Sequence, residues 1–308
     1  MFLAEPQRTA VAAPEVLIVG GGKGGVGKTC FSANLGVEVA RKGWRVIVVD
    51  ADLGCSNLDL VLGVTTPHRL DDFFNQSGRK KLEPLLCDTP YDNLRIVPGA
   101  SGALDIANPR YQQKVALIRE LRRLDADLVI IDLDAGTHLN TLDFFLIAET
   151  SGILVITPEK TSIDNAYKFI RSVVFRKIER FYRSPEVSSL LNRHDSLRSF
   201  LNAFRDSSDF DASLKQQLVQ EMLGLARAIR PKIVVNRARN HYEAEIAANF
   251  LAKNARQSLL VDPQKMGYIL FDTVVPEAVN SGVPYVVSHP ERKISGCIAT
   301  IANHMGFV

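Results

Sequence analysis

The 308-residue chain has few cysteines and no long hydrophobic run. The four cysteines contain no CxxC pair, which favours a reducing, cytoplasmic compartment over a disulfide framework. No stretch approaches about 18 unbroken apolar residues, so we expect no transmembrane helix. Residues 1–14 lack the apolar centre of a signal peptide and are predicted to form a frayed tail. The cysteines are Cys30, Cys55, Cys87 and Cys297.

A strong excess of charge of either sign is also absent. Lysine and arginine number 37 against 34 aspartates and glutamates, a net charge of +3. This balance is too small to indicate nucleic acid or membrane binding by itself, so any such contact needs a local patch. The length allows two domains or one large α/β domain, and either could bury a sizeable core.

Short apolar segments alternate with segments of helical periodicity along the chain. This alternation predicts a parallel sheet covered by helices on both faces, an α/β fold. The expected strands are Val16–Val19, Arg45–Val49, Leu94–Val97, Leu128–Ile131, Ile153–Ile156 and Lys232–Val235, and the helices between them include Lys28–Lys42, Pro109–Arg123 and Asn140–Glu149.

A long segment interrupts the alternation. About 70 residues separate Thr157 from Lys232, far more than one crossover helix needs. We interpret 162–230 as a helical insertion within a single domain that covers 1–308. Its expected helices are Asn165–Arg183, Ser196–Phe204 and Ala212–Ile229, which are separated by Pro185 and by Ser207–Asp211.

A glycine-rich loop carries the most specific signal. Gly22–Thr29 matches GxxxxGK[ST], follows a predicted strand and opens a predicted helix. In such a loop the backbone N–H groups surround phosphates, Lys28 reaches the β- and γ-phosphates, and the Thr29 hydroxyl binds Mg²⁺. The residues predicted to contact the nucleotide here are Gly22, Gly24, Gly25, Val26, Gly27, Lys28, Thr29 and Cys30.

With its second lysine, Lys23, the sequence GGKGGVGKT resembles the deviant Walker A signature of the MinD/ParA family. The general layout is similar to MinD and to FlhG (FleN) within that family. The resemblance implies a three-layer α/β/α P-loop NTPase that binds ATP with Mg²⁺ and dimerises in the presence of ATP. It also implies that Lys23 reaches the nucleotide of the second copy. The alternative is a solvated loop lysine.

Two further segments resemble the switches of this family. Asp50–Asp59 (DADLGCSNLD) looks like switch I, which implies that Asp52 orients the attacking water and that Asp50 supports the Mg²⁺ shell. Either aspartate could instead cap the turn that follows the strand. Asp132 ends an apolar strand, as in the Walker B arrangement, and would bind Mg²⁺ through water; the alternative is a carboxylate of the turn that follows the strand.

Switch II, 132–136, departs from the family pattern. Asp134 occupies a position where the family commonly has a small, neutral or proline residue. A carboxylate near the γ-phosphate would repel it unless a metal or a lysine compensates, or it could face the partner surface. The departure leaves the hydrolysis rate open, but it does not affect the prediction of nucleotide binding.

Two late segments resemble the base-binding part of the family site. Asn236, after a predicted strand, matches the asparagine that hydrogen-bonds the adenine edge, which we favour over the alternative of a turn residue. Val275–Glu277, with Pro276 at its centre, resembles the last loop that packs along the base.

The leading hypothesis is an ATP-dependent dimerising switch ATPase, with Lys23, Lys28 and Asp52 as catalytic residues. It would hydrolyse ATP slowly and position or regulate a cellular machine such as a flagellum, a division site or a partition system. An iron–sulfur carrier is excluded because no cysteine lies between Cys87 and Cys297. An ATP-using synthetase, or a nucleotide-binding regulator without turnover, stays open as an alternative.

The sequence leaves the surface on which this protein acts undecided. We expect a protein partner, with peripheral contact at the inner membrane or non-specific DNA binding also possible. Ile294–Val308 is apolar without a basic face, so we favour a terminal helix packed in the core over a membrane anchor. Arg176, Arg180 and Arg183 share one helical face, which could contact acidic lipid, DNA or protein, or could simply be solvated.

Overall fold

The computed structural model describes residues 13–54, 56–75, 81–100, 109–147, 152–206 and 211–308. Most of the predicted N-terminal tail, and Cys55, lie outside the described residues. Eight strands form one sheet in the order β3-β4-β2-β5-β1-β6-β7-β8, and every pairing except β3–β4 is parallel. The strands are β1 (Glu15–Gly21), β2 (Val46–Ala51), β3 (Cys87–Asp88), β4 (Leu94–Val97), β5 (Leu128–Ala135), β6 (Ile153–Ile156), β7 (Lys232–Ala238) and β8 (Gln264–Leu270).

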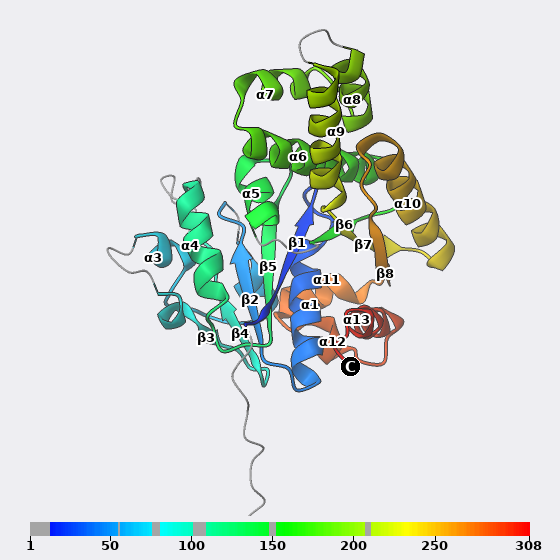
Figure 1. Ribbon diagram of the computed structural model, residues 1–308. Helices are drawn as coiled ribbons and strands as arrows, with labels where there is room; N and C mark the ends of the chain where they lie inside the picture. Colours follow the sequence, from blue (N-terminus) through cyan, green and yellow to red (C-terminus); the bar gives the residue numbers. More distant parts are fainter. Residues whose placement is uncertain (1–12, 55, 76–80, 101–108, 148–151, 207–210) are drawn as a thin grey trace, which may run out of the picture.

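Helices cover both faces of the sheet (Figure 1). Alternate residues of each strand face opposite sides, so Ile18 belongs to one core and Leu17 to the other. This confirms the predicted three-layer α/β/α fold. The helices are α1 (Lys28–Arg41), α2 (Leu58–Val61), α3 (Leu70–Asn75), α4 (Tyr111–Leu121), α5 (Leu139–Ile147), α6 (Lys160–Tyr182), α7 (Pro185–Asn192), α8 (Leu197–Asp206), α9 (Ala212–Arg227), α10 (His241–Asn254), α11 (Val274–Ser281), α12 (Tyr285–Ser288) and α13 (Lys293–His304), with short turns η1 (Glu83–Leu85) and η2 (Ala255–Leu259).

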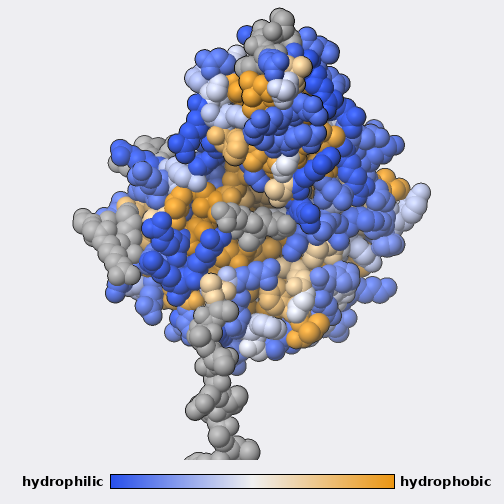
Figure 2. Space-filling view, viewed as in Figure 1, coloured by the Kyte–Doolittle hydropathy of each residue, from blue (hydrophilic) through white to orange (hydrophobic). Residues whose placement is uncertain are grey.

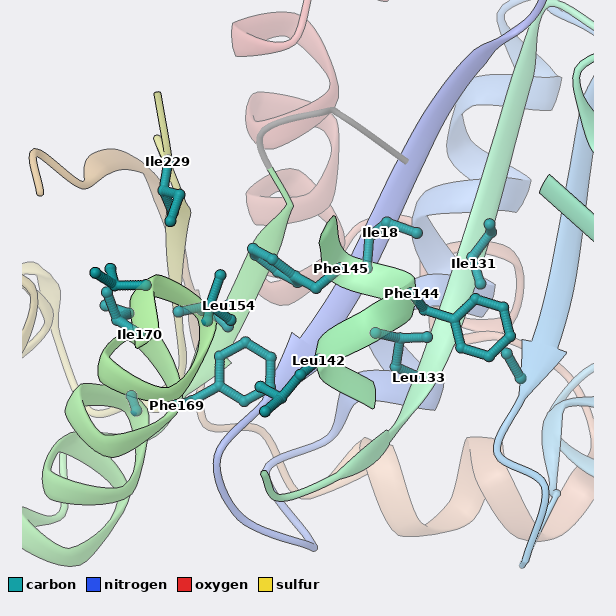
Figure 3. Packing of buried hydrophobic residues seen from close by; sticks show 14 of the residues in the cluster. Ile18, Ile131, Leu133, Leu142, Phe144, Phe145, Leu154, Phe169, Ile170 and Ile229 are labelled. Atoms are coloured by element: carbon teal, nitrogen blue, oxygen red, sulfur yellow. The ribbon is translucent and has the colours of Figure 1, made fainter. Parts of the chain in front are cut away.

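The core beneath α5 and α6 contains large aromatic side chains (Figure 3). Phe145 of α5 and Phe169 of α6 meet edge to face, with ring centroids 5.3 Å apart. Phe144 and Leu142 of α5 are also buried, in the same cluster as Ile18 of β1. Because one helix carries all three of these side chains, α5 is anchored between the sheet and α6.

The region between β6 and β7 differs in detail from the prediction. Helix α6 begins at Lys160, five residues before the predicted start, and it packs on the sheet core through Phe169. Helix α7 was missed because Pro185 was interpreted as a break. Pro185 instead opens the helix, and the hydroxyl of Ser184 caps it by accepting the N–H of Val187 at 3.2 Å. In Figure 1, α7, α8 and α9 lie beyond α6 at the top of the molecule.

The last helix, α13, confirms the prediction of a terminal helix packed in the core. Ile294, Ile298 and Ile301 point into the core shared with α1 and are fully buried. Among the described residues, none of the helices combines the length and apolar character needed to cross a bilayer. Figure 2 shows that hydrophobic side chains on the visible face gather in a band across the middle of the molecule, below α7–α9.

The packing at Phe169 leads to a test of the core. We expect Phe169→Ala to lower the free energy of unfolding by about 3–5 kcal/mol, because the lost ring leaves a cavity against Phe145. Phe250→Ala is the matched control, since Phe250 is 58% exposed, and it should change stability by about 0.5 kcal/mol or less. Urea denaturation of both variants measures the difference, and equal effects would contradict the described packing.

Candidate nucleotide-binding site

The glycine-rich loop joins the end of β1 to the start of α1. Gly25 and Gly27 adopt positive φ angles of 75° and 90°, which ordinary side chains rarely allow. No side chain caps the first turn of α1, which starts at Lys28. The first N–H groups of this helix are therefore directed at the loop, where a phosphate would accept them.

Two glycines of the loop are required by close approach. A Cβ at Gly22 would lie 2.2 Å from the backbone oxygen of Asn165 in α6, and one at Gly27 would lie 2.4 Å from the Nδ2 atom of Asn236. That Nδ2 atom donates to the backbone oxygen of Val26 at 2.8 Å. The loop is thus clamped by α6 on one side and by the end of β7 on the other.

The two lysines of the loop have different surroundings. Lys28 is buried, with 9% of its surface exposed, and its stem packs near Gly21. Lys23 is exposed, and its Nζ atom donates to the hydroxyl of Thr161 in the first turn of α6 at 3.3 Å. Lys28 is therefore built into its own loop, whereas Lys23 lies on the outer surface.

The two carboxylates predicted to serve the metal lie side by side. Asp50 of β2 and Asp132 of β5 are direct neighbours in the sheet register, and both are buried. Ser32 donates to Oδ1 of Asp132 at 3.0 Å, while the buried Oδ2 atom accepts no hydrogen bond from any described residue. Burial raises the pKa of Asp132 to about 6, although Thr29 and Lys28 act in the opposite direction.

Asp50 has a different role within the fold. Its Oδ2 atom accepts the backbone N–H groups of Asn57 and Leu58, at 3.0 and 3.1 Å, and its Oδ1 atom accepts that of Asp52 at 3.0 Å. Burial, followed by the nearby charge of Asp132, raises the pKa of Asp50 to about 7. The side chain of Asp50 therefore holds the backbone of switch I in place. Within switch I, the carboxylate of Asp52 accepts the N–H of Gly54 at 3.0 Å.

The residues present fit a hydrated Mg²⁺ ion. Mg²⁺ in proteins is held by few protein oxygens together with water and substrate phosphates. Asp132 supplies a buried carboxylate oxygen that has no hydrogen-bond partner among the described residues, and Thr29 supplies a hydroxyl beside it. A cation there would offset the unfavourable burial of the two carboxylates.

A cavity of about 340 Å³ lies next to the loop, beside Gly27. It brings together Cys30, Asn236 and Pro276, three residues predicted to contact the nucleotide from distant parts of the sequence. Pro276 was expected in a loop, but it lies in the first turn of α11, where proline is tolerated. The amide of Asn236 is partly engaged already, because Oδ1 accepts the N–H of Arg237 at 2.9 Å.

The sequence did not identify every residue of this cavity. Arg237 has a left-handed φ of 58°, and its guanidinium donates to the backbone oxygen of Gly25 at 3.4 Å. Phe271 at the end of β8, a strand that was not predicted, contributes an exposed aromatic ring to the wall. The position of Arg237 directly after Asn236 was the one available signal.

Switch II borders a smaller cavity of about 220 Å³ between the two switches. Asp134 lines it together with Gly54 of switch I and Asn140 of α5. Another cavity, of about 860 Å³, lies away from the loop between α6 and α10. We assign the nucleotide to the loop because the phosphate-binding backbone and the buried carboxylates are there.

The prediction of a basic face on α6 is wrong for two of its three arginines. Neither alternative, a ligand-binding face or a solvated one, describes Arg176 and Arg180. Both guanidiniums bind the buried carboxylate of Asp143, at 3.1 and 3.2 Å. Of the three arginines, only Arg183 is left as an exposed residue, at the C-cap of the helix.

Comparison with known proteins agrees with this site. Residues 17–285 match the model of the CobQ/CobB/MinD/ParA nucleotide binding domain. The chain belongs to this family. Together with the loop and the paired carboxylates, family membership identifies the site as one for ATP with Mg²⁺.

Two relatives and one solved structure show how far the similarity extends along the chain. The chain is 29% identical to the septum site-determining protein MinD of Bacillus subtilis, over 95% of this chain and 98% of that protein. It is 38% identical to the antiactivator FleN of Pseudomonas aeruginosa, over 51% of this chain and 55% of that protein. MinD of Pyrococcus horikoshii, solved with Mg-ADP, shares the fold with a TM-score of 0.64 at 23% identity, covering 95% of this chain and 96% of that one.

The close approach at Gly22 leads to a prediction. Gly22→Ala should lower the melting temperature, because its Cβ would collide with the backbone of α6. Gly24→Ala is the control, since its Cβ would come no closer than 4.0 Å, to Ala135. Thermal melting of the ligand-free protein compares the two, and an unchanged Gly22→Ala protein would show that loop and helix are not in contact.

The paired carboxylates predict a pH dependence of stability. The folded state keeps protons on Asp50 and Asp132 that the unfolded chain releases near pH 4, so this pair makes the ligand-free protein less stable as pH rises from about 4 to 7. Asp132→Asn cannot lose this proton, so it avoids part of the decrease in stability. The free energy of unfolding of this variant relative to wild type should therefore increase as pH rises from about 4 to 7. Urea unfolding at several pH values measures the difference, and a difference that does not vary with pH would contradict the assignment.

Proposed function

We propose that this protein is an ATP-dependent dimerising switch ATPase. The observation that carries the proposal is the different placement of the two loop lysines. Lys28 is buried beside its own phosphate-binding loop, whereas the amine of Lys23 lies outside it against Thr161. An amine on the outer surface of the loop is available to the nucleotide of a second copy across a shared face.

The reaction proposed is hydrolysis of ATP to ADP and phosphate. Thr29 and Asp132 would hold Mg²⁺, which would supply positive charge that offsets the charge of the phosphates. Lys28 and Lys23 of the opposite copy would stabilise the transferring phosphoryl group, and Asp52 would hold the attacking water. The Asp52 carboxylate lies in switch I, where its Oδ1 atom accepts the N–H of Gly54 at 3.0 Å.

Slow turnover follows from this arrangement. Catalysis depends on positioning and charge, and a stimulating partner or the second copy must complete the site. Asp134 adds a negative charge at the edge of the cavity between the switches. Such a charge opposes the approach of the γ-phosphate unless a cation offsets it, which favours a low basal rate.

The process served is inferred from the relatives. FleN is named an antiactivator, YlxH of Helicobacter pylori a flagellum site-determining protein, and MinD a septum site-determining protein. We therefore propose that ATP-bound dimers position or regulate a cellular machine through a protein partner. A synthetase would need a substrate pocket beside the loop, and the two cavities described there are lined by residues that we assign to the nucleotide and to the switches.

The helices α6–α9 are proposed to belong to the same domain as the sheet. Phe200 of α8 and Met222 of α9 share one core cluster with Ile18 of β1. The chain from 1 to 308 would then be a single ATPase domain, with 162–230 as its helical elaboration. The apolar face of α13 is packed in the core, so this helix is not offered to a membrane. Two arginines of α6 are paired with Asp143, which reduces the positive charge that the α6–α9 layer offers to lipid or DNA. We therefore propose a protein partner for this layer.

The lysine and switch roles lead to one experiment. Lys23→Ala should bind ATP but stay monomeric, because the contact across the dimer is lost. Asp52→Ala should dimerise with ATP and release phosphate about 10²–10⁴-fold more slowly. Light scattering after size exclusion, with and without ATP, and a phosphate-release assay give the two readouts.

Lys265→Ala is the control for the lysine change, because Lys265 is a half-exposed residue paired with Glu245 on the surface of β8. It should behave as wild type. Dimerisation of Lys23→Ala as strong as that of wild type would overturn the dimer proposal. Nucleotide binding without phosphate release by the wild type would instead support a regulator without turnover.

A further inference from the structure

A buried carboxylate joins three helices behind the switches. Asp143 of α5 is 3% exposed, and its Oδ2 atom accepts the ammonium of Lys114 in α4 at 2.9 Å. Lys114 is equally buried, at 2% exposed, so this ion pair is screened from water. The pair therefore fixes the distance between α4 and α5.

The other oxygen of Asp143 joins α5 to α6. Oδ1 accepts Nε of Arg176 at 3.1 Å and Nη1 of Arg180 at 3.2 Å. The guanidinium of Arg180 also stacks 3.5 Å from the ring centroid of Tyr111, at the start of α4. One carboxylate is thus shared by three cations from two helices, and no single partner can move without affecting the others.

The energetics of this group favour a role in geometry. Burial acts to raise the pKa of Asp143, but the hydrogen bonds from Lys114 and Arg176 outweigh it and hold the pKa below its usual value. A buried ion pair contributes little net stability compared with a well-packed apolar replacement. Such a network does impose direction, because each charged atom must keep its partner.

The network reaches switch II through the first turn of α5. Lys114 donates a second hydrogen bond to Oδ1 of Asn140 at 2.7 Å. Asn140 lines the cavity between the switches together with Asp134. This turn follows switch II directly in the chain, because α5 begins at Leu139, three residues after Gly136.

The network also reaches the phosphate-binding loop through α6. This helix carries Arg176 and Arg180 in its second half, and Thr161 and Asn165 in its first two turns. Thr161 holds Lys23, and the backbone of Asn165 lies against Gly22. A shift of α6 relative to α5 would therefore change the position of the loop relative to switch II.

We propose that Asp143 is a positioning residue for ATP hydrolysis, which holds switch II at a fixed place relative to the phosphate-binding loop. It acts through α5 and Asn140 on one side and through Arg176, Arg180 and α6 on the other. The inference rests on the proposed function, because the step that it assists is hydrolysis. It makes the turnover rate sensitive to anything that binds α6–α9 and moves the two arginines.

The test uses two variants of the full chain. Asp143→Asn removes the shared charge, and Arg176→Gln with Arg180→Gln breaks only the link to α6, leaving the buried Lys114 pair intact. We expect kcat to fall about threefold to tenfold while the Kd for ADP changes less than about twofold. Amide hydrogen exchange over 134–147 should accelerate, with exchange in α1 unchanged. Lysine in place of glutamine at position 176 should recover part of the kcat that Arg176→Gln loses, because it returns a positive charge to Asp143.

Lys168→Gln is the control, because Lys168 lies on α6 in an exposed pair with Asp164 and should have no effect. If Asp143→Asn does not fold, the double arginine variant decides. Folded variants with wild-type kcat and unchanged exchange over 134–147 would overturn the inference. If the wild type releases no phosphate, the proposed function fails, and the exchange measurement alone decides whether Asp143 holds switch II.

Discussion

The parallel pairing of β2, β5 and β1 is the constraint on which the site depends. This pairing places Asp50 directly opposite Asp132, and it brings the end of β1, with the phosphate-binding loop, to the same edge of the sheet. Parallel strands end together, so the residues that follow them converge without any contact between side chains being needed. A shift of one residue in either register would turn a carboxylate away from the loop.

That convergence places unfavourable charge in the protein interior. Two buried carboxylates lie side by side, and Lys28 is the cation that the loop brings to them. Asp50 accepts three backbone N–H groups of switch I, whereas one oxygen of Asp132 has no hydrogen-bond partner in the part of the chain that the structure describes. A hydrated cation beside Asp132 would offset this negative charge. If Asp132 holds the cation, nucleotide binding and the backbone of switch I would be linked through these neighbouring carboxylates.

The sequence predicts the parts of the site that are local. The glycine-rich loop and the strand-end aspartates lie within short segments whose spacing reports their geometry, and the parallel core follows from its apolar runs. Contacts between segments that are distant in the chain leave no recognisable pattern in the sequence, so they were not predicted. Nothing near Arg176 indicates Asp143, 33 residues earlier, or shows that Asn236 holds Val26, 210 residues away. Helix α7 was missed because a proline at a first helical position looks like a break until the capping serine before it is considered.

Helix α6 connects the observations that the sequence could not relate. Over its length it contacts the glycine-rich loop at Gly22, the sheet core through Phe169, and the helix after switch II through Arg176. A helix moves as a nearly rigid rod, so a displacement at one end is transmitted to the other. The loop and switch II can therefore change their separation only if α6 and α5 slide past each other, which would break the contacts of Asp143. In this protein, a phosphate bound at the loop and a partner bound at α6–α9 would then both act on the contacts of Asp143 between α5 and α6.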